Sequence, residues 1–341
     1  MIIDNFLEKG RDFLGVKYPI ICGAMTWVSE PQLVAAVSNA GGFACLAGGN
    51  TPVDILEKQI LETSNLTDKP FGINLITISP SYTDHLKMIK RVKPAFIIFA
   101  GSFPKRKEIE RAKESGAKII CFASTLSIAK RMIKYGSDAI VLEGMEAGGH
   151  IGHVSLTVLL QQVLFHTKNV PVFVAGGIST GKMMAHLLMM GASGVQLGTR
   201  FVLSDECIAH ENFKRIFQKA NARDAISTPQ FDSRLPVVAV RALRNKGTDN
   251  FGQLQLKLLK QMAKNKISRE EAQLEVEKYW MGALRNAVVD GDVVSGSLMA
   301  GQSVGLLKEI MPVKEIINEL INDAEAEFIQ LKKSLISASS Q

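Results

Sequence analysis

The sequence contains few cysteines, and their spacing is not that of a metal site. Its 341 residues include four of them, Cys22, Cys45, Cys121 and Cys207, and no C-x-x-C pair. Structural zinc sites need such pairs, and disulfide frameworks belong to short, cysteine-dense chains. We therefore predict no metal site and no disulfide. Buried free cysteines behave as small hydrophobes and are typical of a reducing compartment, so we expect a cytoplasmic protein.

Aromatic residues and long apolar runs are also scarce. Only 6% of the residues are aromatic, and they are not interleaved with basic residues, which argues against binding of nucleic acid. The longest uncharged run, residues 147–167, includes glycines, histidines and glutamines, so it predicts a loop and a buried helix rather than a membrane span. Charges interrupt residues 1–15, and no signal peptide is expected there.

The chain does have a regular alternation of apolar runs and amphipathic segments. Eight short runs rich in Val, Ile and Phe recur at intervals of roughly 20 to 30 residues, as in β-α units. They are residues 19–23, 43–47, 71–76, 95–100, 118–122, 139–142, 172–175 and 194–197. Between them, apolar residues recur at the spacing of a helix, for example at 31–40, 53–62, 104–115, 126–135 and 181–190. Strands buried on both faces need no polar alternation. Eight such units favour a closed (β/α)8 TIM barrel over an open doubly wound sheet.

This alternation of apolar runs and amphipathic segments ends after residue 203. Residues 204–303 are charged and mainly helical in pattern, without a parallel strand. We predict a barrel over residues 1–203, an inserted helical subdomain on the substrate side over 204–303, and a C-terminal segment, 304–341, whose helix packs back on the barrel.

Glycine-rich turns follow two neighbouring predicted strands. Gly176-Gly177 closes the seventh strand and Gly198-Thr199 closes the eighth. Glycine lets the backbone approach a phosphate closely, and the N–H groups of the next helix start can bind its charge. The pair predicts a cradle for a phosphorylated ligand, although glycines also serve tight turns. The spacing G-x-x-x-x-G-K that begins at Gly176 predicts no ATP site, because Met183 stands where a hydroxyl is needed.

A histidine among glycines follows the sixth strand, in the segment from Glu143 to Gly152. Reactive groups of a barrel lie in such loops. His150 is therefore a candidate to transfer a proton or to hydrogen-bond a substrate oxygen, since imidazole titrates near neutral pH. A purely structural loop histidine is the alternative. His153 is a weaker candidate, because it stands at the start of the next helix.

Taken together, these segments resemble the FMN-dependent flavoprotein family that contains enoyl-acyl-carrier-protein reductase II and nitronate monooxygenase. The resemblance extends from Tyr18 to about Gly305 and rests on residues 18–27, 69–74, 143–152, the two glycine turns and 296–302. It implies His150 as the functional histidine, which would orient or protonate an acyl thioester in the reductase or act as the base in the monooxygenase. It implies FMN contacts from Gly23, Ala24, Met25, Asn74, Glu143, Gly149, Gly176, Gly177, Gln196, Gly198, Thr199, Met299 and Gln302.

Within that family two activities stay open. Nitronate monooxygenases commonly carry Q-A-P-M in the first loop and G-G-H-R-G around the histidine, whereas residues 22–25 and 148–152 read C-G-A-M and G-G-H-I-G. Together with Trp27, this favours the reductase, in which NADH or NADPH binds transiently and reduces FMN, and the flavin reduces a trans-2-enoyl thioester.

The alternatives are oxidation of alkyl nitronates by O₂ and, from another class, a barrel that binds a phosphate ligand without redox chemistry. Residues 178–197 contain no cysteine. This disfavours a reaction like that of inosine-monophosphate dehydrogenase, which needs a nucleophilic thiol there.

Basic residues are concentrated beyond the barrel. Residues 204–270 contain 13 Lys plus Arg and 7 Asp plus Glu, while the whole chain has a formal charge of +7. A basic surface beside the mouth would attract an acidic partner such as acyl carrier protein or a dinucleotide pyrophosphate. A solvated helical face is the alternative. Arg241 and Arg244 are the basic residues that we expect to matter most. A homodimer is compatible with the sequence.

Overall fold

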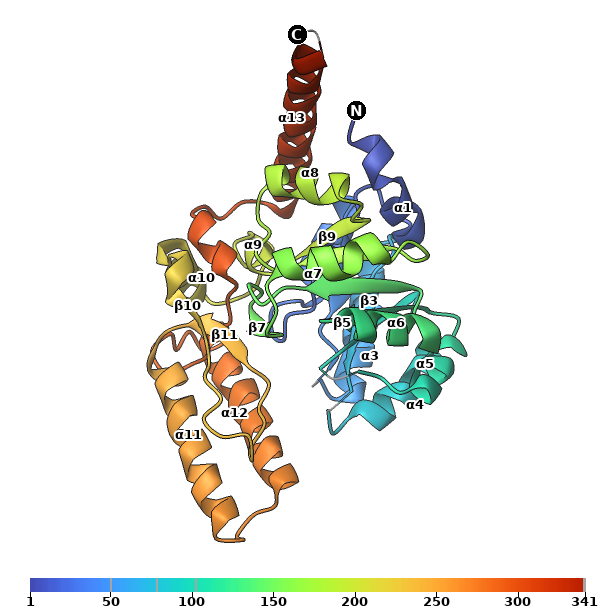
Figure 1. Cartoon of the computed structure of the whole chain (residues 1–341). Helices are drawn as coiled ribbons and strands as arrows, with labels where there is room; N and C mark the ends of the chain where they lie inside the picture. Colours follow the sequence, from blue (N-terminus) through green and yellow to red (C-terminus); the bar gives the residue numbers. More distant parts are fainter. Residues whose placement is uncertain (50, 78, 102, 340–341) are drawn as a thin grey trace.

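The computed structural model describes residues 1–49, 51–77, 79–101 and 103–339. Eight parallel strands form a closed barrel, which confirms the predicted fold (Figure 1). The strands are β1 (Ile20–Cys22), β2 (Phe43–Leu46), β3 (Gly72–Ile76), β4 (Phe96–Ala100), β5 (Lys118–Ala123), β6 (Ala139–Glu143), β8 (Val172–Ala175) and β9 (Gly194–Leu197). The barrel closes where Ile20 of β1 pairs with Val195 of β9. Each of the eight predicted runs overlaps one of these strands, and β5 and β6 each extend one residue beyond the predicted run.

Helices surround the strands and bury their outer faces. They are α1 (Asp4–Leu14), α2 (Pro31–Asn39), α3 (Val53–Leu66), α4 (Tyr82–Val92), α5 (Arg106–Lys113), α6 (Leu126–Tyr135), α7 (Leu156–Val163), α8 (Gly181–Met189) and the short α9 (Thr199–Val202). Inside the barrel, Phe43, Ile98 and Phe173 pack together in a separate cluster. Because both faces of the strands are buried, the apolar runs show no polar alternation.

Residues 204–303 hold a feature that the prediction of a mainly helical segment omitted. Besides α10 (Glu211–Lys219), α11 (Lys246–Ala263) and α12 (Arg269–Val288), they contain β10 (Ala225–Ser227) and β11 (Val240–Leu243). These strands form an antiparallel sheet in the order β10-β11-β7, and β7 is Gly149–His150 of the barrel loop. This sheet exists only through pairing between distant segments, which a local pattern in the sequence does not report.

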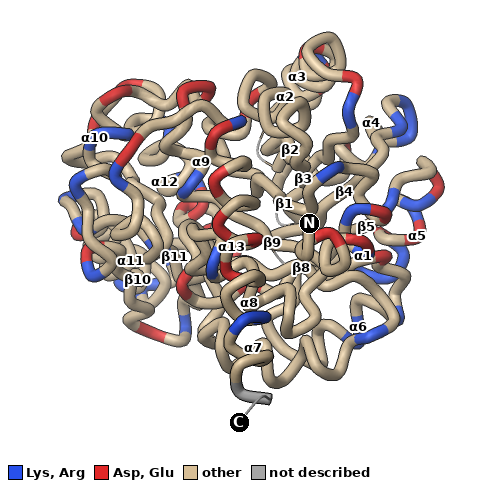
Figure 2. Tube along the Cα trace, turned by 90° about the horizontal axis from the view of Figure 1, so that it is seen from above, with Lys and Arg blue, Asp and Glu red and all other residues tan. Residues whose placement is uncertain are grey.

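Helices α11 and α12 form a hairpin that extends away from the barrel, with the loop between them at its far end (Figure 1). Its own small core contains Phe251 and Trp280, whose ring centroids are 4.3 Å apart. Lys264 and Lys266 belong to that far loop. Around α10, α11 and α12, basic residues are interspersed with acidic ones (Figure 2).

The helix of the predicted C-terminal segment, 304–341, begins later than the segment itself. A short 3₁₀ turn (Gln302–Leu306) is followed by non-helical residues, and α13 (Val313–Ser339) begins directly after Pro312. Proline disfavours helix in the residue before it and is tolerated at a helix start. Helix α13 packs against α8 and projects beyond the barrel (Figure 1). No helix in the described part of the chain combines the length and apolarity that a bilayer crossing requires.

Candidate active site

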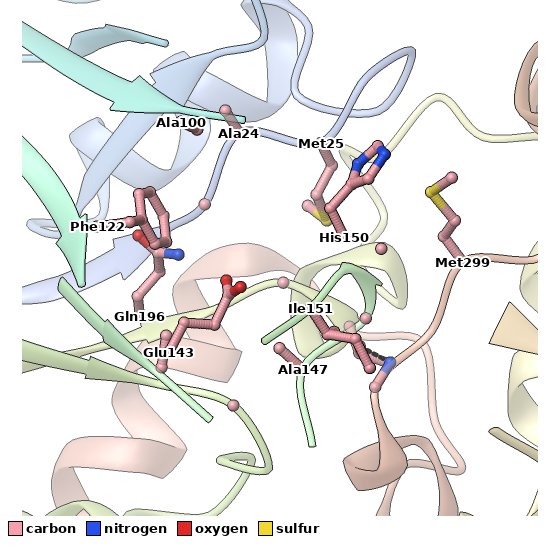
Figure 3. A pocket seen from close by; sticks show the side chains of 18 of the residues that line it. Ala24, Met25, Ala100, Phe122, Glu143, Ala147, His150, Ile151, Gln196 and Met299 are labelled. Atoms are coloured by element: carbon pink, nitrogen blue, oxygen red, sulfur yellow. Dashed lines mark hydrogen bonds between the residues drawn. The ribbon is translucent and has the colours of Figure 1, made fainter. Parts of the chain in front are cut away.

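A cavity of about 420 Å³ opens at the carboxyl ends of the barrel strands, a size within the usual range for cofactor and ligand sites. Its walls include the predicted site residues Gly23, Ala24, Met25, Asn74, Glu143, Gly149, His150, Gly176, Gly177, Gln196, Gly198, Thr199 and Met299. In the close view, Phe122, Glu143 and Gln196 lie at one end, and Met25, His150 and Met299 lie at the other (Figure 3). Gln302 is not among the described lining residues; its backbone N–H donates to the Glu146 carbonyl at 3.0 Å.

The two glycine turns lie side by side, because β8 and β9 are hydrogen-bonded neighbours. Gly176 and Gly177 both adopt left-handed backbone conformations, with φ of 98° and 71°. A Cβ atom on Gly176 would stand 2.9 Å from the Gly144 carbonyl oxygen, so the turn fits closely against the loop after β6. At the second turn, the Thr199 hydroxyl accepts a hydrogen bond from the Gly301 N–H at 3.0 Å. The backbone can therefore approach a ligand phosphate from two adjacent strand ends.

The inner end of the cavity is polar. Glu143 lies at the end of β6, where removal from bulk water raises the pKa of its carboxyl to about 8. Asn74 is buried and donates from Nδ2 to the Ile98 carbonyl at 3.2 Å. The side chain of Gln196 lies against Gly23, where an added Cβ would be 3.1 Å from its Nε2. These groups supply the donors and acceptors that the polar edge of an isoalloxazine ring requires.

His150 lies on a strand, where the sequence had indicated a loop. In the antiparallel sheet it pairs with Val240 of β11, and the following Ile151 N–H donates to the Ala239 carbonyl at 2.9 Å. Segment 204–303 thus holds the backbone on both sides of the imidazole. The Nε2 atom is buried and has no hydrogen-bond partner among the described residues. The side chain as a whole lines the cavity and is 37% exposed, so the imidazole can contact a bound ligand.

Glu277 is a cavity residue that the sequence did not indicate. It lies on α12, and its Oε2 is 3.6 Å from His150 Nε2. It borders the buried face of the helix, next to Val276 and three residues before Trp280. That position was the one feature of the sequence that could have indicated Glu277 as a site residue. Only the docking of α12 over the barrel brings this carboxylate to the histidine.

Arg241 is not part of an accessible basic surface, so that expectation is wrong. Its side chain is only 3% exposed. Its Nε donates to the Met145 carbonyl at 2.9 Å and its Nη1 to the Ala225 carbonyl at 2.6 Å. Burial lowers the pKa of the guanidinium, and nearby Glu146 opposes this effect. Arg241 therefore connects β10 to the loop that precedes His150. Arg244, in contrast, is exposed.

A closed barrel with two glycine turns at neighbouring strand ends, a polar inner end and a histidine on the cavity wall has the features of a cofactor-binding barrel enzyme. The nitronate monooxygenase family model matches residues 8–323 of the chain. The chain therefore belongs to the nitronate monooxygenase family and is an oxidoreductase, which confirms the resemblance. Enzymes of this family are in general FMN-dependent.

Known proteins similar to this chain carry different names within that family. The "(3aS,4S,5R,7aS)-5-hydroxy-7a-methyl-1-oxo-octahydro-1H-indene-4-carboxyl-CoA dehydrogenase" of Mycobacterium tuberculosis is 30% identical over 92% of this chain and 94% of its own length. The nitronate monooxygenase of Paraburkholderia phytofirmans is 29% identical over 94% and 96%. The structure of FabK from Thermotoga maritima superimposes with a TM-score of 0.84 at 36% identity, over 95% of this chain and 98% of that one.

Proposed function

We propose that the protein is an FMN-dependent reductase of 2-enoyl thioesters that uses NADH or NADPH. The observation that carries the proposal is the set of apolar side chains that line the same cavity as His150. Phe103, Val238, Leu284 and Met299 line it. An acyl chain would bury apolar surface there, whereas a small alkyl nitronate has little to bury. Similarity to FabK and to a dehydrogenase of a CoA thioester supports the same substrate class.

In this reaction a hydride from the nicotinamide ends on the β-carbon of the enoyl thioester, and a proton is added to the α-carbon. The nicotinamide becomes oxidised and the double bond becomes a single bond. When bound, the flavin would supply the two-electron redox chemistry that connects the two substrates. The two glycine turns would bind the flavin phosphate, and Asn74, Glu143 and Gln196 would contact the ring.

His150 would act at the thioester. Its imidazole, which lines the cavity, can donate a hydrogen bond to the thioester carbonyl oxygen or deliver the proton for the α-carbon. Glu277, 3.6 Å away, would orient the imidazole and stabilise positive charge on it. The side chains around the mouth would exclude water from the reacting carbons.

The test is anaerobic flavin reduction by NADH or NADPH, followed by reoxidation with crotonyl thioester. The expected result is rapid reoxidation by the thioester. His150→Ala should lower turnover by about 10²- to 10⁴-fold with the flavin still bound. His153→Ala is the matched control, because His153 is exposed and outside the described cavity lining. Reoxidation by O₂ alone would contradict the proposal.

A second candidate is oxidation of alkyl nitronates by O₂, with His150 as the base. The family match and the likeness to the Paraburkholderia enzyme favour it. Nitrite release from propyl-2-nitronate, with little oxidation of NADH or NADPH, would decide for this reaction. A protein that is colourless after reconstitution with FMN would instead support a non-redox barrel for phosphate ligands.

The proposed assignment extends to location and partners. We place the enzyme in the cytoplasm, because all four cysteines are free and buried. Residues 204–303 would form the substrate-side subdomain, and 304–341 would form the C-terminal segment whose helix packs back on the barrel. A thioester on acyl carrier protein is one substrate form; gel filtration with and without that carrier would reveal a complex and would also report a homodimer.

A further inference from the structure

We propose that a basic rim formed by Phe103, Lys105, Lys107 and Arg131 binds the adenosine polyphosphate tail of a substrate whose reactive end occupies the cavity. The inference rests on the proposed function, since it concerns the same cavity. It adds a subsite on the wall opposite to the one supplied by segment 204–303. We call these four residues the basic rim.

Phe103 joins the basic rim to the cavity. It lines the cavity wall, and its side chain is 38% exposed. It belongs to the loop after β4, next to the start of α5, while Arg131 lies on α6 after β5. The Arg131 Cζ atom stands 5.5 Å from the centre of the Phe103 ring. An exposed ring paired with a guanidinium offers a surface on which a planar base can stack.

The lysines at this rim have no carboxylate partner of their own. Lys105, Lys107 and Arg131 are exposed and form no ion pair within the described residues. Of the two nearby acids on α5, Glu110 pairs with Arg106 at 2.9 Å. The other, Glu108, accepts the Lys105 backbone N–H at 2.6 Å. Arg131 stands beside the Phe103 ring, and two further cations without an ion pair, Lys105 and Lys107, follow within four residues of Phe103, so a polyanion would be attracted there.

The basic residues of segment 204–270 are less suited to this role. Arg241 is buried, and Lys214 is buried with its Nζ donating to the Ser204 carbonyl at 2.6 Å. Lys264 and Lys266 belong to the loop at the far end of the helical hairpin (Figure 1). These four residues are thus poorly placed for a ligand tail, whereas Phe103 of the basic rim lines the cavity itself.

The chemistry of the rim fits an adenine base together with several phosphates. A coenzyme A thioester and a nicotinamide dinucleotide both carry this group. In each, a flexible or extended linker separates it from the reacting atoms. A thioester on acyl carrier protein carries a single phosphodiester and no adenine, so the rim predicts a preference for the coenzyme A form over the carrier-protein form.

The experiment uses the FMN-loaded protein with Lys105→Glu/Lys107→Glu, and Lys134→Glu as control. Lys134 is exposed on α6, the helix of Arg131, and has no ion pair among the described residues. The double variant should raise the KM for crotonyl-CoA about tenfold, and leave the KM for crotonyl-pantetheine within about twofold. Phe103→Ala should act in the same direction, and the control should match the wild type. A rise in the KM for NADPH alone would support the rim with the dinucleotide as its occupant.

Equal changes in the KM for crotonyl-CoA and crotonyl-pantetheine, with no change in the KM for NADH or NADPH, would overturn the proposal. So would no change at all. Calorimetric titration with adenosine 3′,5′-bisphosphate keeps the inference separate from the proposed function. It should show binding that weakens about tenfold in the double variant, even if the enzyme reduces no thioester. Absence of binding to the wild type, despite thioester reduction, would overturn the rim and leave the reaction intact.

Discussion

The barrel and segment 204–303 contribute to the same cavity, but they hold their residues by different means. In the barrel, Gly176 and Gly198 stand at the ends of hydrogen-bonded neighbours, so the sheet register alone brings them together. In segment 204–303, Glu277 and Arg241 reach the site because α12 and β11 dock against a loop of the barrel. The first arrangement depends on backbone geometry, and the second depends on side chains that are far apart in the chain.

This difference suggests which changes each region tolerates. A glycine turn at a strand end should bind its ligand more weakly when a side chain is added, because there is no space for one. The docked segment should lose stability when a polar side chain is removed, because the partners of that side chain lose their hydrogen bonds. Four substitutions separate these cases.

The largest expected effect concerns Arg241→Leu. The change removes the donors that satisfy two carbonyl oxygens in the interior, those of Met145 and Ala225. We expect the free energy of unfolding to fall by about 3 kcal/mol. Arg244→Leu, at an exposed residue, should cost less than about 0.5 kcal/mol. Urea unfolding of the apoproteins measures both, and equal losses would contradict an internal role for Arg241.

At the barrel end, Gly176→Val should weaken FMN binding by about 100-fold. The added Cβ would meet the Gly144 carbonyl oxygen at 2.9 Å, and φ is 98°. Gly191→Val is the matched control, since Gly191 has φ of 102° but no atom within 4 Å of an added Cβ. Both variants carry the backbone strain, so only the site contact distinguishes them. Fluorescence titration with FMN gives the dissociation constants, and similar weakening in both would show strain to be the cause.

Glu143→Gln should stabilise the apoprotein in a pH-dependent way. The folded pKa of about 8 lies above the ordinary carboxyl value of 4.5, so the folded state holds a proton that the unfolded state releases between these pH values. Wild-type stability should therefore fall relative to the variant as pH rises from about 4.5 to 8, by up to a few kcal/mol, and then run parallel. Thermal melts across this range test the prediction. Glu110→Gln, at an exposed residue, should show no such divergence.

The smallest expected effect belongs to Glu277→Gln, which should lower kcat about tenfold and leave KM within about twofold. The glutamine keeps the shape of the side chain but removes the charge beside His150. Glu275→Gln, on the same helix and paired only with Lys278, should have no effect. If Glu277 acts through the histidine, the substitution should add nothing in a His150→Ala background. A further tenfold loss there would contradict this role.

The sequence alone predicts the barrel, because each strand and each glycine turn is recognised from a short stretch of neighbouring residues. Eight apolar runs without polar alternation predict eight buried parallel strands, and the two glycine turns lie at neighbouring strand ends in any such barrel. The barrel topology therefore places one cavity beside Gly176, Gly177, Gly198 and Thr199. His150 on the cavity wall followed from the same rule, since its segment comes after the sixth strand.

Other features depend on contacts between distant segments, and only the tertiary structure decided them. The two-residue strand at Gly149–His150 exists because β11 pairs with it more than 80 residues later in the chain. The same docking buried Arg241, which the sequence placed on the surface, and brought Glu277 to the histidine. Periodicity reports which face of an element is buried, but it does not report what covers that face. The partner of a buried charge is therefore set by the fold as a whole.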